Sequence, residues 1–542
     1  MIRAPSLRVL NRAYRASLRP AWERFRRAAD DPYGAQQRAL QRVLASAAGT
    51  AFAREHELEG VRSLSDYQRA VPPRDYDEHA PWIERMLQGE EQVLTAEAPH
   101  AFERSSGSTS ASKYIAYTRG LMAEFGAATS PWLYDLLRHQ ELRGSSYWSL
   151  STSPALHETT PGGTRIGLAD DTEYFPRPIR RLLQFMLPVP SAVSRLPDME
   201  HCRHATLCYL LRDPTLSFVS VWAPSFWTLL LERAARSGDA LMRDLEGGAI
   251  RPPDGGPPLE LPPVKTSRAR LREIERALAN PGPEAWGRLW PRWKLISCWT
   301  DANAAFQLPE LQASLPAGVA IQGKGLFATE GAVSFPVVGF SGAVLAVNSH
   351  LLELDPLDGS APILASDAEV GRRYAPLLST AGGLYRYRLG DALEVVGFYR
   401  RTPRVRFVGR LDGVSDLAGE KLSPSRVAEA LARVAHGHRP RFALLAPRAD
   451  RRGYRVFVEG PPAVAFAAAL ETELRRGHHY DLCRKLHQLE ALSGVAVEHG
   501  MAAYEAALVA RGSKAGEIKP PALHTGTFWG EVFGASKEQP AG

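Results

Sequence analysis

Short apolar stretches rich in β-branched and aromatic residues alternate with helical patterns along this chain after residue 113. Leu216 to Val221 and Trp293 to Cys298 are typical of buried strands, whereas Leu229 to Ala235 and Arg268 to Ala279 carry apolar residues at helical spacing. Such alternation is typical of layered α/β proteins. We therefore predict an α/β fold, with a helical lead-in before residue 105.

Composition limits the classes of protein to which the chain can belong. With 542 residues, 44% of them hydrophobic, it can bury cores for two to four domains, and we expect a monomer. The net charge of +7 is spread along the chain among 59 acidic residues, which argues against a nucleic-acid partner. No apolar run is long enough to span a membrane and no apolar signal region follows Met1, so we expect a cytoplasmic protein. Four cysteines in so long a chain argue against a disulfide framework.

The N-terminal segment is the most basic part of the chain. Between Arg3 and Arg27 apolar residues recur at helical spacing, which predicts an amphipathic helix. A packed helix with outward arginines is favoured, and a transit peptide is the alternative.

A change of pattern near Leu411 predicts a domain boundary. Before it, Gly383 to Val408 reads as a small β-meander with extended segments at Leu384–Tyr387, Leu393–Tyr399 and Val405–Val408. After it, Ser423 to Val434 starts a new helix, followed by further strands and helices. We predict a large domain over residues 1–410 and a small α/β domain over residues 411–542.

The segment from Ser105 to Lys113 reads Ser-Ser-Gly-Ser-Thr-Ser-Ala-Ser-Lys. Small residues let backbone N–H groups approach phosphate oxygens, hydroxyl groups add donors, and a lysine adds a positive charge. The composition therefore suits a loop that binds the phosphates of ATP, although similar clusters also form plain loops.

Three further motifs follow in order: Leu326 to Gly331, Leu384 to Asp391, and Glu517 to Pro521. Together with the serine-rich loop they resemble the adenylate-forming superfamily. The resemblance is closer to the Gretchen Hagen family of plant auxin-responsive acyl-acid amido synthetases and their bacterial relatives, and it extends from about Asp31 to Pro521. It implies a large domain with β-sheets and a β-barrel-like region flanked by helices, plus a mobile C-terminal domain.

The resemblance implies a ligase that uses ATP and Mg²⁺ to join a carboxylic acid to an amino acid through an acyl-adenylate. In the large domain it assigns Phe327 to the adenine, Glu330 to Mg²⁺, and Asp391 to the ribose hydroxyls. The remaining nucleotide contacts would come from Ser105, Ser106, Gly107, Ser108, Thr109, Thr329 and Tyr387. Ser110 stands where the superfamily commonly has glycine.

The C-terminal motifs add a hinge and a second lysine. Val408 to Gly413 resembles the segment about which the small domain moves, which assigns Asp412 to the hinge and Arg410 to the nucleotide. Lys519 would join Lys113 as a catalytic residue, because a compact ammonium can approach phosphate and carboxylate oxygens closely. Lys514 is the competing candidate.

Several alternatives remain open at this stage. The acyl group could pass to coenzyme A or a carrier thiol, or the chain could bind a nucleotide or a small acid without turnover. Candidate walls of the acyl pocket are Trp148–Ser153, Val219–Trp227 and Trp299–Phe306, which would otherwise be buried core. Gly318 to Gly325 resembles a P-loop, but its apolar centre favours a strand. His201, Cys202, His204 and Cys208 do not have the spacing of a common zinc site.

Overall fold

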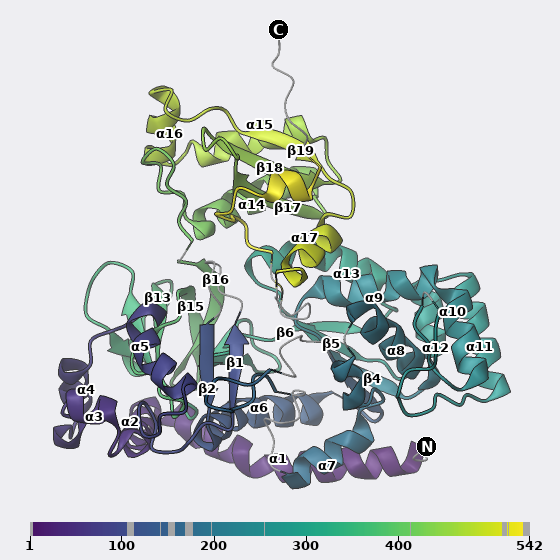
Figure 1. The fold of residues 1–542 in the computed structure, drawn as a ribbon, viewed down its shortest axis with the longest axis horizontal. Coiled ribbons are helices and arrows are strands. Elements are labelled where there is room, and N and C mark those ends of the chain that lie inside the picture. The colour runs from purple at the N-terminus through teal and green to yellow at the C-terminus, as the bar shows by residue number, and fades with distance from the viewer. Residues whose placement is uncertain are drawn as a thin grey trace.

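The structure is a computed structural model that describes residues 4–105, 113–140, 142–149, 158–168, 177–196, 198–253, 255–411, 413–511, 518 and 520–534. Two sheet-containing regions lie side by side in Figure 1, and the C-terminal elements lie above both of them. The predicted α/β class is confirmed, because parallel and antiparallel sheets are both packed against helices. Among the described residues no helix is both long and apolar enough to cross a bilayer.

Helices form the N-terminal region, as predicted. The first, α1, is the amphipathic helix, and it buries Tyr14, Leu18, Trp22 and Phe25 while most of its arginines face solvent. Its packing follows from the apolar stripe, which would otherwise be exposed to water. The helices are α1 (Ala4–Asp30), α2 (Pro32–Ala47), α3 (Ala51–Glu55), α4 (Leu64–Ala70) and α5 (Tyr76–Leu87), with a 3₁₀ turn η1 (Leu58–Gly60).

A parallel sheet of four strands lies in the centre of the chain. Its order is β3 (Ser145–Trp148), β4 (Leu216–Ser220), β5 (Leu295–Cys298) and β6 (Ala320–Gly323). Strand β6 lies within the P-loop-like segment, which confirms that this segment is a strand. The preceding antiparallel hairpin is β1 (Ala101–Ser105) and β2 (Lys113–Tyr117).

Helices cover both faces of the parallel sheet. On one face, α6 (Arg119–His139) reaches β6 through Trp132, whose indole N–H donates to Gln322 Oε1 at 3.1 Å. The other face packs into an apolar core with the helices that connect the strands. The helices of this region are α7 (Arg177–Met186), α8 (Met199–Arg212), α9 (Pro224–Arg236), α10 (Gly238–Gly247), α11 (Arg268–Ala279), α12 (Pro283–Leu289) and α13 (Leu308–Ser314), with 3₁₀ turns η4 (Ser191–Arg195) and η5 (Ala302–Gln307).

An antiparallel sheet of eight strands follows, which is larger than the small β-meander predicted from the sequence. Along the main path it runs β12-β11-β13-β15-β16-β10-β9, and β14 pairs with β13. The strands are β9 (Ser334–Pro336), β10 (Ala343–Leu345), β11 (Leu351–Pro356), β12 (Ile363–Leu364), β13 (Arg373–Ser379), β14 (Tyr387–Arg388), β15 (Asp391–Tyr399) and β16 (Thr402–Arg410). The short hairpin β7 (Phe327–Ala328) and β8 (Gly331–Ala332) precedes them, and η6 (Ala365–Asp367) follows β12.

The strand predicted over Leu384–Tyr387 is wrong. Only Tyr387 of that segment is in a strand, and Arg386 has a positive φ of 49°. Side chains from elsewhere in the chain replace strand pairing here: the backbone N–H of Tyr385 donates to His79 Nε2, and that of Arg386 donates to Ser379 Oγ. The segment is therefore a turn that leads into β14.

The C-terminal elements form a smaller α/β unit with its own apolar clusters. Strand β17 (Phe442–Pro447) pairs antiparallel with β18 (Tyr454–Glu459), which pairs parallel with β19 (Ser493–Ala496). The helices are α14 (Pro424–His438), α15 (Ala463–Leu474), α16 (His478–Lys485), α17 (Gly500–Val509) and α18 (Trp529–Val532).

Polar contacts attach the C-terminal unit to the rest of the chain. Arg203 of α8 forms an ion pair with Glu505 of α17. Burial raises the pKa of Glu505, although the nearby Arg203 charge opposes this shift. Arg373 of β13 also pairs with Glu429 of α14 at 3.0 Å. The first pair holds α17 against α8 beside the parallel sheet, and the second holds α14 against the antiparallel sheet.

Candidate active site

The predicted phosphate loop connects the two strands of a hairpin. Ser105 ends β1 and lies opposite Lys113, the first residue of β2. Ser106, Gly107, Ser108 and Thr109 lie outside the described residues, so their predicted roles stay predictions. The hairpin places the two ends of the loop beside each other.

Lys113, Tyr387 and Glu330 meet, although each belongs to a different motif. The Lys113 ammonium donates to the Tyr387 hydroxyl oxygen at 3.3 Å, and that hydroxyl donates to Glu330 Oε1 at 3.2 Å. Burial, together with the nearby Glu330 charge, raises the pKa of Tyr387 far above its ordinary value. The phenol therefore stays protonated and links a cation to a buried carboxylate.

Hairpin β7–β8 presents the second motif. Thr329 and Glu330 form its turn, and the Tyr117 hydroxyl of β2 donates to the carbonyl oxygen of Thr329 at 2.8 Å. A side chain at Gly331 would collide with the imidazole of His350, because a Cβ there would lie 2.9 Å from His350 Nε2. That imidazole nitrogen accepts from the Ala332 N–H at 2.9 Å. Thr-Glu-Gly is thus held in place by β2 and by a buried histidine.

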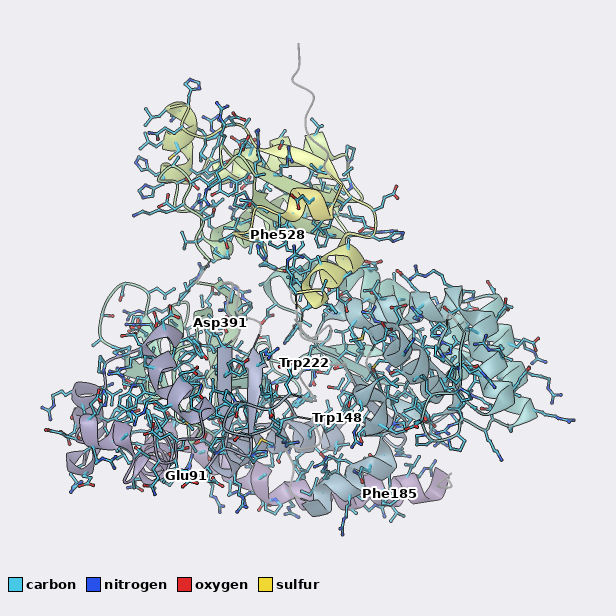
Figure 2. All side chains as sticks on the ribbon, viewed as in Figure 1. Glu91, Trp148, Phe185, Trp222, Asp391 and Phe528 are labelled. Carbon is cyan, nitrogen blue, oxygen red and sulfur yellow. The ribbon has the colours of Figure 1, made fainter. Side chains whose placement is uncertain are left out.

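Asp391 and Arg410 lie at the open end of hairpin β15–β16. They are opposite each other in the strand register, and Arg410 Nη1 is 3.5 Å from Asp391 Oδ1. Asp391 is buried and Arg410 is partly exposed. Figure 2 shows Asp391 near the centre of the molecule, beneath the C-terminal unit.

Phe327 of β7 is partly exposed, and its ring lies near those of Trp132 and Trp222. Asp412 and Lys519 lie outside the described residues.

Arg386, which also belongs to the third motif, has a different environment. Its guanidinium is buried, forms two bonds of 2.8 and 2.9 Å to Glu353, and donates to the carbonyl of Val71. Paired in this way, Arg386 fixes the turn before β14 and is not directed at a ligand.

Sequence reasoning missed two buried groups. Lys324 follows β6, and only the P-loop comparison drew attention to it. The second group joins His204 and Cys208 of α8 to Asp244 of α10, with His204 Nε2 2.9 Å from Asp244 Oδ2. The spacing of His204 and Cys208 on one helix was the only signal for it, since Asp244 lies on another helix. All four cysteines are buried and free.

Comparison with known proteins identifies the class of fold. The structure superposes on a solved GH3.15 acyl acid amido synthetase with a TM-score of 0.80, at 19% identity and covering 95% of each chain. A second solved structure, AtGH3.15 acyl acid amido synthetase in complex with 2,4-DB, gives a TM-score of 0.81 at 17% identity, covering 96% of each chain. The chain therefore has the fold of the acyl acid amido synthetases.

The sequence identifies the family. Residues 21–318 match the GH3 family N-terminal domain and residues 344–410 match the GH3 family central domain. The chain belongs to the GH3 family, which confirms the resemblance to the Gretchen Hagen proteins. It is 25% identical over 448 residues to a probable indole-3-acetic acid-amido synthetase GH3.12 from Oryza sativa subsp. japonica, covering 72% of this chain and 70% of the relative. A human GH3 domain-containing protein is 29% identical over 196 residues, covering 34% of this chain and 35% of that protein.

Proposed function

We propose that this chain is an ATP-dependent acyl-acid amido synthetase. In the first step a carboxylate oxygen of the acid attacks the α-phosphorus of ATP and pyrophosphate leaves, giving an acyl-adenylate. In the second step the nitrogen of an amino acid attacks the acyl carbon, AMP leaves, and the amine loses a proton. Activation is needed because an unmodified carboxylate has a poor leaving group, which leaves the protein to position the reactants and neutralise phosphate charge.

The contact between Lys113, Tyr387 and Glu330 carries this proposal. It joins three of the motifs at one point, over sequence separations of 274 and 57 residues. Lys113 can neutralise phosphate oxygens, and Tyr387 orients both charged side chains. The Glu330 carboxylate fits a hard cation, so it would hold the Mg²⁺ that accompanies the triphosphate.

The remaining nucleotide contacts follow the family pattern. Asp391 would accept hydrogen bonds from the ribose hydroxyls, Phe327 would contact the adenine, and Thr329 would contact a phosphate. Serines 105, 106 and 108, with Gly107 and Thr109, would surround the phosphates. Arg410 would contact the nucleotide while it pairs with Asp391.

We also infer a domain boundary after residue 410, with Asp412 as the hinge of the small domain. Two observations support it. The match to the family's central domain ends at residue 410, and among the described residues the apolar clusters of the C-terminal unit are built from residues after 416. Movement about the hinge would bring Lys519 to the α-phosphate for the first step.

Acid-dependent exchange of labelled pyrophosphate into ATP tests the first step. The protein is incubated with Mg²⁺-ATP, labelled pyrophosphate and one acid at a time, with no amine present. Exchange with any acid supports adenylation. Failure of every acid, with ATP binding measured separately, supports the alternative of a nucleotide binder without turnover.

The acceptor is tested next. The active acid is incubated with ATP and each amino acid, and products are identified by mass spectrometry. An amide supports the proposed activity. A thioester that forms only with coenzyme A or a carrier thiol would replace it with the other alternative.

A further inference from the structure

Lys324 lies in an aromatic cluster at the carboxyl ends of the parallel strands. Its ammonium lies over the indole of Trp222, 4.6 Å from the ring centroid, and over Trp132 at 5.1 Å. The same ammonium donates to Ser220 Oγ at 2.6 Å. Only 4% of Lys324 is exposed, and its ammonium contacts a hydroxyl and two aromatic faces.

Ser220 belongs to a polar row that crosses the sheet. Ser220 of β4 lies beside Ser297 of β5, which lies beside Gln322 of β6. Neighbouring residues in register project to the same face of a sheet, which here is the face covered by α6. The Ser297 hydroxyl is buried without a hydrogen-bond partner in the described part of the chain. Polar groups that converge at the carboxyl ends of parallel strands mark a common position for ligand sites in α/β proteins.

Trp222, whose ring contacts the ammonium, is one of three neighbouring aromatic side chains that are partly exposed. The ring centroid of Trp222 is 5.5 Å from that of Trp299 and 6.5 Å from that of Phe327. Trp222 lies near the centre of the molecule in Figure 2. Their accessible faces provide surfaces on which a planar ring can stack.

Phe327 connects this cluster to the candidate nucleotide site. Its ring is 6.2 Å from that of Trp132, and it lies on the same short hairpin as Glu330. A ligand against Phe327 would therefore lie next to the groups proposed to bind ATP. That position suits the acid that ATP activates.

We propose that Lys324 binds the carboxylate of the acyl substrate and that Trp222 and Trp299 select an acid with a planar aromatic ring. This inference rests on the proposed function, whose acyl substrate it specifies. A carboxylate beside the ammonium would form a charge-assisted hydrogen bond with it. Ser220 is a positioning residue, because it orients the ammonium.

Binding of matched acids and amides tests the role of Lys324 without turnover. Indole-3-acetate and indole-3-acetamide have the same ring, but only the acid carries a charge. Their affinities are measured by calorimetry with Mg²⁺ and α,β-methylene-ATP, which cannot form an adenylate. We expect the wild-type protein to bind the acid about tenfold more tightly than the amide, or better, and Lys324→Met to abolish that preference.

Two further variants separate binding from folding. Ser220→Ala keeps the lysine and should reduce the preference for the acid only in part. Lys294→Met removes an exposed lysine just before β5 and should leave the preference unchanged. The proposal is overturned if Lys324→Met still prefers the acid, or if the folded wild-type protein binds the two ligands equally.

Selection of the ring is tested with phenylacetate and hexanoate. We expect phenylacetate to bind more tightly than hexanoate, and Trp222→Leu to reduce this difference. Equal affinities in the wild-type protein contradict the aromatic assignment. Pyrophosphate exchange separates a failure of the proposed ligase activity from a failure of the role of Lys324. Acid binding without exchange contradicts only the ligase activity. Exchange in the wild-type protein, with an unchanged acid preference in Lys324→Met, contradicts only the role of Lys324.

Discussion

Asp391 and Arg410 face each other across the open end of hairpin β15–β16, with 3.5 Å between carboxylate and guanidinium. The sequence motifs assigned both residues separately to the nucleotide, whereas the structure pairs them. Arg410 therefore has a role without any ligand: it stabilises the charge of a buried carboxylate at the open end of the hairpin.

Replacing Asp391 should weaken ATP binding directly. If its carboxylate accepts hydrogen bonds from the ribose hydroxyls, Asp391→Asn should cost about 1.5 to 3 kcal/mol of binding free energy. Calorimetric titration with ATP measures this. An unchanged ATP affinity in Asp391→Asn would remove Asp391 from the nucleotide site.

Replacing Lys113 should act mainly on the rate of adenylation. Its ammonium stabilises charge that develops on the phosphates, and loss of one such group commonly lowers the rate by about 10²- to 10³-fold. We expect this loss in pyrophosphate exchange for Lys113→Met, and a smaller loss for Tyr387→Phe, which removes only the bridging hydroxyl. Lys265→Met, at an exposed position, should exchange at the wild-type rate. A Lys113→Met variant as active as this control would exclude the assignment.

Lys519 is expected to act in the transition state of adenylation and to contribute little to the binding of ATP. Lys519→Ala should slow exchange by orders of magnitude while ATP affinity stays within about tenfold of the wild type. Lys514→Ala is the matched control, because it removes the competing lysine of the same segment. If Lys514→Ala is slow and Lys519→Ala is normal, the two assignments must be exchanged.

Periodicity predicted most local structure well. Helix α11 occupies the residues expected from its pattern, because that pattern reflects a single buried face. Strand β4 lies within the predicted stretch from Leu216 to Val221. The pattern failed at Leu384–Tyr387, where His79 and Ser379 supply the hydrogen-bond partners of the backbone. Those partners come from other segments, so the residues of the turn themselves contain no signal for it.

The candidate site was also predicted only in part from the sequence. Motif resemblance identified Lys113, Glu330 and Tyr387 individually, but their contact depends on how two sheets and a hairpin pack. Lys324 was noticed only within a motif that it does not complete. Its aromatic surroundings come from Trp132 on α6 and from Trp222 after β4, which no local spacing relates to it.

Arg386 and Glu353 should contribute strongly to folding. Both are buried and joined by two hydrogen bonds, so removing one partner leaves an uncompensated charge in the core. Arg386→Met should lower the free energy of unfolding by about 3 to 5 kcal/mol. Urea titration measures it, with Arg388→Met as a control because Arg388 is exposed. The double variant Arg386→Met/Glu353→Leu should lose less than the sum of the single losses, and strict additivity would argue against a coupled pair.

The stability of the C-terminal unit should depend on His524. Burial, with a smaller effect from the Arg511 charge, lowers the pKa of His524 from 6.5 to about 4. Its Nδ1 accepts from the N–H of Gly526, and its ring meets Trp529 edge-on at 5.0 Å. A folded-state pKa below the unfolded value means that the unfolded chain binds the proton first. The contribution of neutral His524 to the free energy of unfolding is therefore complete above about pH 6.5 and is lost as the pH falls toward 4.

Lowering the pH from 7.5 to 5 should lower the free energy of unfolding by about 2 kcal/mol through this histidine. Urea unfolding at the two pH values, followed in the C-terminal unit by hydrogen exchange of its backbone amides, measures the loss. His524→Asn keeps an acceptor near the position of Nδ1 but carries no titratable group. It should therefore show a pH dependence smaller by about that amount, because other histidines titrate equally in both proteins. Equal pH dependence in the variant and the wild type would mean that His524 protonates in the folded unit at its ordinary pKa.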